Sequence, residues 1–223
     1  MTSFDCARQV RRKLGAQRVG HGGTLDPAAR GLLMILIGGA TRGQDAFLGL
    51  EKEYWFCGQF GLKSATGDLE GNVIDRRPCD HVTGDRLTAA LQAFVGDIQQ
   101  TPPSFSALKY NGKPYYYYAR KGIDIPRASR PISILALSLL SLRLPYWEAR
   151  VVCSRGTYVR TLVEDIAERL GTCAVLVELV RERVGPYKRE QALTWQELHR
   201  ISAENLLPLL LPGPKESVPP AYA

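Results

Sequence analysis

The first residues of the chain carry apolar side chains at helical spacing. Between Thr2 and Leu14 the apolar positions lie three or four residues apart, which places them on one helix face: Phe4, Ala7, Val10 and Leu14. Thr2 followed by Asp5 predicts a capping box at the N-terminus, and Gly15 predicts the C-terminal end. The sequence therefore predicts an amphipathic helix over 2–14.

The rest of the chain mixes strand-like and helix-like patterns. Alternating or β-branched apolar runs predict strands at 54–60, 132–144, 147–153 and 174–184. Helical spacing, Thr83 as a cap and terminal glycines predict helices at 83–95, 156–170 and 195–207. The helix of 156–170 has an apolar face formed by Val159, Leu162, Val163, Ile166 and Leu170. Strands and helices in this mixed order indicate an α/β protein.

Composition narrows the class of protein. The 223 residues include 29 Lys and Arg against 22 Asp and Glu, a net charge of +7 that suits a polyanionic partner. No apolar run approaches the ~20 residues that would span a membrane, and no secretory signal is visible, so we expect a cytoplasmic protein with no membrane partner. The five cysteines form no C-x-x-C pair, and we expect neither a zinc site nor a disulfide framework.

One polar, glycine-rich stretch interrupts these patterns at 19–33. It places His21, Thr24, Asp26 and Arg30 among glycines, just before the apolar run 32–37. Pro27 disfavours helix at Asp26, so the stretch predicts an irregular loop that presents one carboxylate. It lacks the Gly-Lys-Ser/Thr of a phosphate loop and the ligand set of a metal site. An ordinary turn remains an alternative reading of the composition.

A second unusual segment runs from about 100 to 130. It combines several prolines, the tyrosines of 115–118 and the cations Lys109, Lys113, Arg120 and Lys121. Aromatic rings interleaved with cations are typical of surfaces that stack on unpaired bases and hold phosphates. A surface excursion whose tyrosines cover the core is the alternative.

Five stretches resemble the motifs of the TruB family of pseudouridine synthases, in family order. They are 20–27 (GHGGTLDP), 52–54 (KEY), 102–109 (PPSFSALK), 118–122 (YARKG) and 153–160 (CSRGTYVR). The resemblance covers roughly 2–194. It departs from the family at Val180, where the family has the first of two arginines, and the short strand that usually precedes the first helix is missing here.

The resemblance implies a fold and a domain organisation. We expect a pseudouridine synthase catalytic domain over 1–203, a single α/β (α+β) unit with a large mixed, mostly antiparallel sheet and flanking helices. A thumb-like insertion at about 100–130 and a flexible tail over 204–223 complete the chain, with no C-terminal RNA-binding domain of the PUA type.

The resemblance also implies an activity. We expect isomerisation of the uridine at position 55 in the T-loop of tRNA, by a monomer that needs no cofactor, no metal and no guide RNA. The alternatives are an enzyme of this fold that acts on another RNA, and a non-catalytic tRNA-binding or chaperone protein.

Residue roles carry over only where the motifs match. Asp26 corresponds to the family nucleophile, Arg160 to the arginine that keeps it charged, and Tyr54 to the tyrosine that stacks on the flipped base. His21 corresponds to a histidine that helps to displace the target nucleotide. The remaining candidates for substrate binding are Thr24, Lys109, Tyr118, Arg120, Arg155, Tyr158 and Arg181.

Overall fold

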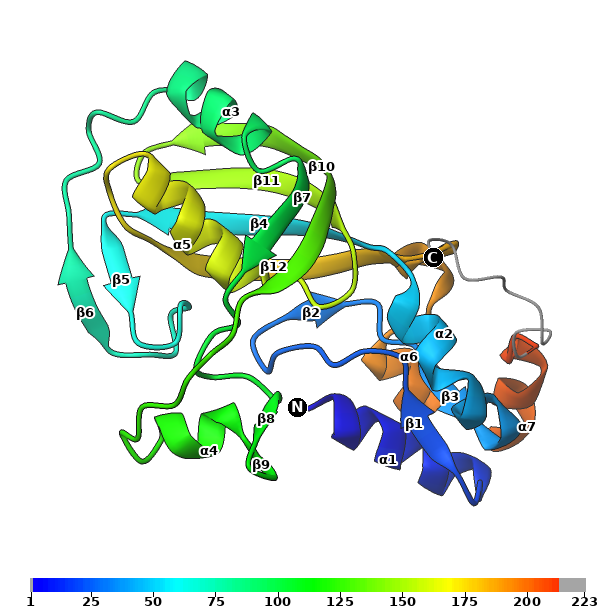
Figure 1. The fold of residues 1–223 in the computed structure, drawn as a ribbon. Helices are drawn as coiled ribbons and strands as arrows, with labels where there is room; N and C mark the ends of the chain where they lie inside the picture. The colour runs from blue at the N-terminus through cyan, green and yellow to red at the C-terminus, as the bar shows by residue number, and fades with distance from the viewer. Residues whose placement is uncertain (1, 213–223) are drawn as a thin grey trace. The chain divides into compact units, whose positions relative to one another are not determined.

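The computed structural model describes residues 2–212 and divides the chain into two compact units (Figure 1). Of the described residues, the first unit comprises 2–52 and 180–212, and the second comprises 53–179. Two strands, β4 (Lys52–Phe60) and β12 (Ala174–Val184), pass from one unit into the other. The catalytic domain over 1–203, which the family resemblance implies, stays a prediction.

The second unit is built on a sheet in which β12, β4, β11 (Tyr146–Cys153), β10 (Arg130–Arg143) and β7 (Gly96–Gln100) are successive neighbours. The ladders of β10 with β11 and with β7 are antiparallel, and β10 and β11 are joined by a short turn. All the strands that the sequence predicted here are present. The α/β class is therefore confirmed, with a sheet that is mixed because β12 also pairs in parallel with β2 (Arg30–Gly31).

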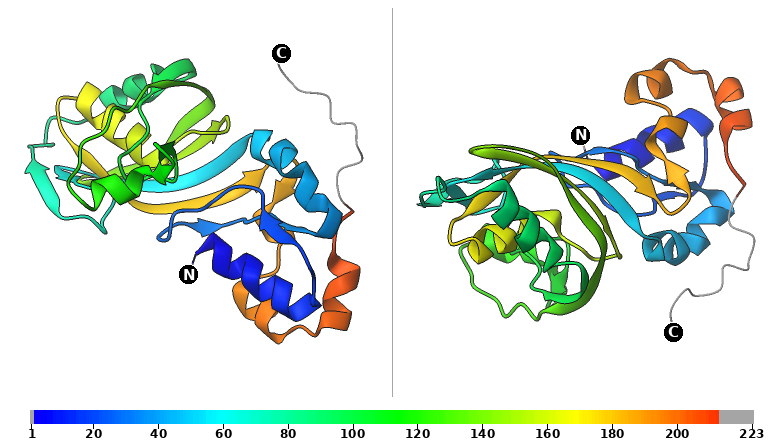
Figure 2. Two further views of the ribbon diagram at one scale, coloured as in Figure 1. Left: turned by 60° about the horizontal axis from the view of Figure 1, so that its bottom comes forward. Right: turned by 90° about the horizontal axis from the view of Figure 1, so that it is seen from above.

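Two helices cover one face of this sheet, α3 (Gly84–Gln92) and α5 (Val159–Arg169), as Figures 1 and 2 show. Thr83 caps α3 through its side chain, as predicted. Helix α5 begins at Val159 rather than at Gly156, because Gly156 has a φ of +82° that ends the preceding turn outside helical geometry. Its predicted apolar face is buried throughout.

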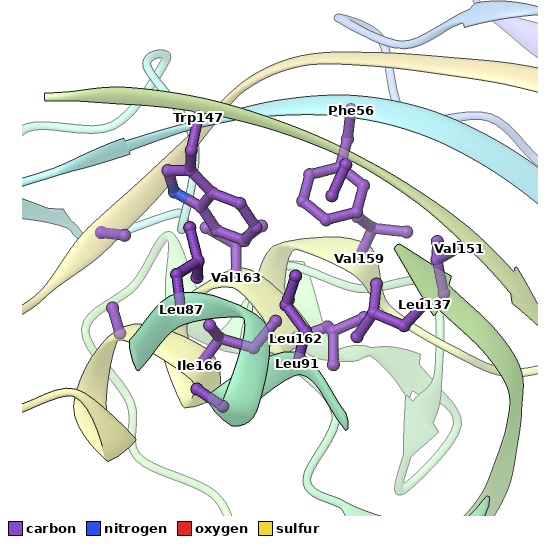
Figure 3. Close-up of a cluster of buried hydrophobic side chains, with 14 of the residues drawn as sticks. Phe56, Leu87, Leu91, Leu137, Trp147, Val151, Val159, Leu162, Val163 and Ile166 are labelled. Atoms are coloured by element: carbon purple, nitrogen blue, oxygen red, sulfur yellow. The ribbon is translucent and has the colours of Figure 1, made fainter. Parts of the chain in front are cut away.

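The core of the second unit lies between the sheet and these helices (Figure 3). Trp147 is fully buried and stacks on Phe60 at 5.3 Å between ring centroids, while Phe56 meets it edge-on at the same distance. Leu87 and Leu91 of α3 face Leu162 and Ile166 of α5 across this layer. Each fully buried aliphatic or aromatic side chain contributes about 1.5–3 kcal/mol, so this layer fixes α5 and the residues at its N-terminus.

Two excursions leave the sheet of the second unit. The first is the hairpin of β5 (Leu62–Ser64) and β6 (Val73–Arg76). The second leaves at Gln100 and returns at Arg130, which are partners in the β7–β10 ladder. It contains the small hairpin of β8 (Lys109–Tyr110) and β9 (Lys113–Pro114), followed by α4 (Tyr115–Ala119). The segment predicted as an insertion is thus a closed excursion with structure of its own.

The first unit opens with α1 (Ser3–Leu14), whose capping box and Gly15 end are both confirmed. One prediction for its apolar face is wrong, because Phe4 is 62% exposed and stacks under the guanidinium of Arg8 at 4.9 Å. Ser3 is buried in its place. The antiparallel pair of β1 (Val19–His21) and β3 (Ile35–Ile37) follows. Next come a 3-10 turn, η1 (Gly38–Gly43), and α2 (Gln44–Gly49).

The C-terminal part of the first unit begins with the second half of β12, which pairs with β2 and β13 (Tyr187–Lys188). The short elements η2 (Arg189–Gln191), α6 (Trp195–Arg200), α7 (Ala203–Leu206) and η3 (Leu207–Leu209) follow. The single helix predicted over 195–207 is therefore two helices, with Ser202 capping the second. Of the predicted flexible tail, 204–209 is helical and 213–223 lies outside the described residues.

Candidate active site

The loop that carries Asp26 joins β1 to β2 and is irregular, as predicted. Asp26 is half-buried, and its carbonyl accepts a hydrogen bond from the Ala29 amide at 2.9 Å. The Leu25 amide donates to Oγ of Ser3 at 2.9 Å, which ties the loop to the N-terminus of α1. Gly22 packs so closely on Phe47 that an added Cβ would lie 2.8 Å from the Cβ of Phe47. This glycine is therefore needed for close packing and not only for a turn.

A buried arginine forms hydrogen bonds with the backbone of this loop. Arg181 is 1% exposed, and its guanidinium donates to the carbonyls of Leu32 at 2.7 Å, Gly23 at 3.1 Å and Thr24 at 3.4 Å. The sequence predicts Arg181 as an RNA-binding residue; among residues 2–212 the hydrogen bonds of its guanidinium all go to backbone carbonyls. Thr24 is exposed at the surface of the loop, and its carbonyl is one of the acceptors.

His21 lies at the end of β1, directly before the loop. Its burial lowers the pKa of the imidazole below the usual value, and the positive charge of Arg181 lowers the pKa further. Its Nδ1 is buried and has no hydrogen-bond partner within residues 2–212. The backbone carbonyl of His21 accepts from the side-chain amide of Gln44 at 2.9 Å. The lowered pKa favours the neutral form of the ring, and the hydrogen bond from Gln44 fixes the backbone that carries it.

Lys52, from the KEY motif, is a second buried cation of the first unit. The side chain is 6% exposed, and Nζ donates to the carbonyls of Leu48 and Leu50, each at 2.6 Å. These carbonyls belong to the C-terminal end of α2, where a positive charge is favourable. The only signal for Lys52 in the sequence is its place in the KEY motif.

Arg160 occupies the first turn of α5 in the second unit and is 5% exposed. Its guanidinium donates to the carbonyls of Thr66 at 2.8 Å and Phe105 at 3.0 Å, and the Asp68 carboxylate lies 3.9 Å away. A cation in the first turn opposes the helix dipole by about 0.3–1 kcal/mol, and these acceptors offset that cost. Arg160 thus joins α5 to the β5–β6 turn and to the insertion.

Gln100 fixes the residue that precedes α5. Its side chain is 2% exposed and makes two hydrogen bonds with the backbone of Tyr158: Nε2 donates to the carbonyl at 3.1 Å, and Oε1 accepts from the amide at 2.8 Å. Tyr158 is the N-cap residue of α5, which has no side-chain cap. The sequence named Tyr158 for substrate binding but missed Gln100, since a glutamine in a strand carries no distinctive signal.

The other candidates of the second unit occupy β4, the loop before α5 and the insertion. Tyr54 lies on β4, half-buried against the core, and Arg155 is exposed in the loop before α5. Lys109 and Arg120 are exposed on the insertion. The hydroxyl of Tyr118 donates to the carbonyl of Tyr110 at 3.0 Å, so this ring also supports the insertion internally.

The insertion carries a cationic cluster whose members belong to the aromatic and basic pattern noted in the sequence. Lys113 and Lys121 lie over the ring of Tyr117, at 4.5 and 4.6 Å from its centroid. Hydrogen bonds from Lys121 and Lys113 lower the pKa of the Tyr117 phenol. Arg120 stacks over Tyr116 at 5.4 Å. Cations held by aromatic rings form a surface suited to phosphates and bases.

A further basic feature lies in the first unit. Gln17, Arg18, Gly38, Gly39 and Arg42 line a cavity of about 350 Å³. Within residues 2–212, neither Arg18 nor Arg42 forms an ion pair, so both guanidinium groups are available to an anion. The sequence analysis did not identify this pair, because the two arginines come from separate segments.

The family assignment rests on two family models that together cover most of the chain. Residues 11–159 match the model described as TruB family pseudouridylate synthase (N terminal domain). Residues 160–213 match the tRNA pseudouridylate synthase B C-terminal domain. The chain belongs to the TruB family. The family, and with it the class of enzyme expected from the motifs, is confirmed.

Curated relatives of this TruB-family chain carry the name tRNA pseudouridine synthase B. The relative from Aromatoleum aromaticum is 44% identical over 212 residues, which are 95% of this chain and 68% of that protein. The relative from Geobacillus kaustophilus is 40% identical over 95% of this chain and 76% of its own length. The chain spans about two thirds to three quarters of these relatives.

Solved structures confirm the fold. A chain in the crystal structure of a Cbf5-Nop10-Gar1 complex is 28% identical with a TM-score of 0.68, over 88% of this chain and 49% of that chain. A chain of the archaeal box H/ACA sRNP Nop10-Cbf5 complex is 26% identical with a TM-score of 0.64, over 89% and 49%. The present chain thus spans about half the length of these structural neighbours.

The TruB candidate residues are distributed over both units. Asp26, His21, Thr24 and Arg181 belong to the first unit, and Tyr54, Arg160 and the insertion belong to the second. Among residues 2–212, no three His, Cys, Asp or Glu side chains gather as a metal site would require. No helix in the same range is both long and apolar enough to cross a bilayer.

Proposed function

We propose that this TruB-family protein isomerises a specific uridine to pseudouridine in the T-loop of tRNA, at position 55. Its curated relatives are named for a tRNA pseudouridine synthase, and the GHGGTLDP motif that resembles their active-site motif is present in full. The observation that carries the proposal is the Asp26 loop. A single half-buried carboxylate lies on an irregular segment that backbone contacts hold in place.

Asp26 is the proposed nucleophile. Pseudouridine formation breaks the bond between ribose C1′ and uracil N1 and forms a bond between C1′ and C5. The proton at C5 leaves and N1 gains one, so no atom is gained or lost overall. A carboxylate can hold one fragment covalently while the base turns, without an oxidant or a reductant.

Arg160 and Tyr54 are the proposed partners of Asp26 in the reaction. A guanidinium beside Asp26 would keep the carboxylate ionised and directed. Arg160 suits that role because carbonyls from two different segments fix its orientation. The phenol ring of Tyr54 would stack on the extruded uracil and assist removal of the C5 proton, and His21 would help to displace the nucleotide from the T-loop.

The proposed RNA-binding residues lie on three segments: the Asp26 loop, the insertion and the loop before α5. The candidates are Thr24, Lys109, Tyr118, Arg120, Arg155 and Tyr158, to which the structure adds the Lys113–Tyr117–Lys121 cluster. Electrostatic attraction of this kind supplies much of the affinity for RNA and weakens with salt. We further propose that the protein acts as a cytoplasmic monomer on tRNA without a guide RNA, although its structural neighbours come from H/ACA complexes.

The test is conversion of a T-stem-loop transcript, with pseudouridine mapped chemically, by the wild type and by Asp26→Asn. We expect the wild type to convert one uridine and Asp26→Asn to bind the transcript with unchanged affinity and convert none. Asp45→Asn is the matched control: it removes one exposed carboxylate from α2 of the same unit and should leave the rate unchanged.

Two outcomes would contradict the proposal. A wild type that binds the transcript and converts nothing is a tRNA-binding protein rather than an enzyme. Conversion of an unrelated stem-loop, with the T-stem-loop left unmodified, would show the same chemistry on another RNA.

A further inference from the structure

Arg181 is a buried cation whose side chain and backbone both contact the Asp26 loop. The guanidinium donates to the carbonyls of Gly23 and Thr24, which precede Asp26, and to that of Leu32, which follows it. The backbone carbonyl of Arg181 accepts from the Leu32 amide at 2.8 Å. One residue of β12 therefore ties together both ends of the segment on which Asp26 lies.

The burial of this charge is costly for the fold. At 1% exposure the guanidinium has lost its water, and no carboxylate within residues 2–212 forms an ion pair with it. Uncompensated burial of a charge costs several kcal/mol, and carbonyl dipoles offset only part of it. A well-packed apolar residue would serve stability as well. The arginine is therefore better explained by the geometry that it imposes.

Hydrogen bonds to three separate carbonyls require a planar group with several N–H donors. Nε, Nη1 and Nη2 each reach a different carbonyl, whereas a lysine ammonium is a compact charge that could not span the three. The glycines of the loop fit around it. Gly23 has a φ of +131°, and a Cβ there would lie 3.6 Å from Nη1 of Arg181. Gly31 has a φ of +104°, and a Cβ there would lie 2.2 Å from the carbonyl oxygen of Arg181.

We propose that Arg181 is a positioning residue that fixes the conformation of the Asp26 loop and makes no contact with RNA; its effect on catalysis rests on the proposed function. The role follows from the three carbonyl contacts on either side of Asp26 and from the near-complete burial of the side chain. The rival explanation is a phosphate contact, which would require the guanidinium to leave these carbonyls.

The experiment compares Arg181→Lys with Arg183→Lys. Arg183 lies two residues further along β12, pairs with Glu51 at 2.6 Å and keeps 22% of its side chain exposed. Three quantities are measured on each: the single-turnover rate on the T-stem-loop transcript, the salt dependence of transcript binding, and amide hydrogen exchange over residues 22–32. Both substitutions preserve charge, so they differ only in the loss of the buried fork.

For Arg181→Lys we expect a rate at least about 30-fold lower, since misplacement of a reacting group by about 1 Å can cost about 100-fold. Amide hydrogen exchange over residues 22–32 should accelerate at least tenfold. Amide exchange in α5 and the salt dependence of transcript binding should stay unchanged. Arg183→Lys should change each quantity less than about threefold. An unchanged rate and exchange would overturn the proposal. Weaker binding with a salt slope reduced by about one would establish a phosphate contact instead.

Hydrogen exchange separates this proposal from the proposed function. It is measured on the free protein and needs no activity. If the wild type converts no uridine, the proposed function fails, while faster exchange over 22–32 in Arg181→Lys would still establish the positioning role. Unchanged exchange in that variant would refute the positioning role whether or not the enzyme is active.

Discussion

Gln100 is the residue at which the insertion leaves the sheet, and its replacement tests whether this residue fixes the N-terminus of α5. Gln100→Leu keeps the volume of the side chain but removes both hydrogen bonds to the Tyr158 backbone, at a position that is 2% exposed. Each such bond contributes about 0.5–1.5 kcal/mol net, so we expect a loss of about 1–3 kcal/mol in the free energy of unfolding. For a chain of this size that lowers Tm by roughly 2–12 °C.

The functional effect should exceed the effect on stability. Tyr158 precedes the turn that holds Arg160, whose contacts to Thr66 and Phe105 depend on the position of that turn. We expect kcat on the T-stem-loop transcript to fall at least about tenfold at 25 °C, with KM changed less than about twofold. Gln100→Glu should behave in the same way at pH 8. It should recover in part at lower pH, because a protonated carboxyl can again donate to the Tyr158 carbonyl.

The control for lost stability is Leu87→Ala, which opens a cavity at a fully buried site in α3 and costs about 2–5 kcal/mol. It touches no hydrogen bond of Tyr158. A variant at Gln100 that is destabilised as expected but retains the wild-type kcat would refute the link between Gln100 and Arg160. A Leu87→Ala variant with the same loss of kcat would show that instability alone explains the effect.

Two further substitutions have expected outcomes. Gly31→Ala should destabilise the first unit by at least about 3 kcal/mol, seen as a Tm fall of roughly 6–12 °C, because its φ is +104° and the new Cβ would meet the carbonyl oxygen of Arg181 at 2.2 Å. Asp165→Asn should raise Tm at pH 7 and have no effect near pH 4. Burial raises the pKa of this carboxyl despite the partial opposition of Lys63, so its contribution is fully present below the unfolded pKa of about 3.9 and is lost as the pH rises through the folded pKa.

Controls for these two are available in the same chain. Gly84→Ala lies at the start of α3 with no atom within 4 Å of the new Cβ, and it should be neutral or slightly stabilising. A Gly31→Ala variant as stable as wild type would show that β2 and β12 can separate without cost. Equal gains of stability from Asp165→Asn at pH 4 and pH 7 would contradict the raised pKa of that group.

The positions of the longer helices and strands were predictable because they depend on local chemistry. The capping box of α1, the Thr83 cap of α3 and the strands 132–144 and 147–153 were all placed within a few residues. The errors are equally local in cause. A helix start was predicted at Gly156 because the sequence does not reveal the positive φ of this residue. One helix was predicted over 195–207 because Ser202 was not identified as the cap of a second helix.

The candidate site was only half predictable. The motifs brought Asp26, Tyr54, His21 and Arg160 to attention, and their roles remain predictions. The motifs did not show which groups the buried cations contact. Arg181 was predicted to bind the substrate, and its hydrogen bonds to the backbone of the Asp26 loop were not foreseen; Lys52 was given no role, although its ammonium donates to the last carbonyls of α2.

The sequence by itself determined the approximate positions of the longer helices and strands, the positive charge and the family, because each of these depends on residue types or on neighbouring residues in the chain. The tertiary structure alone decided what the long cationic side chains do. An arginine on a strand has the same local pattern whether it meets water, a phosphate or three carbonyls. Residues more than 140 positions away supply the acceptors that place Arg181 beneath its loop.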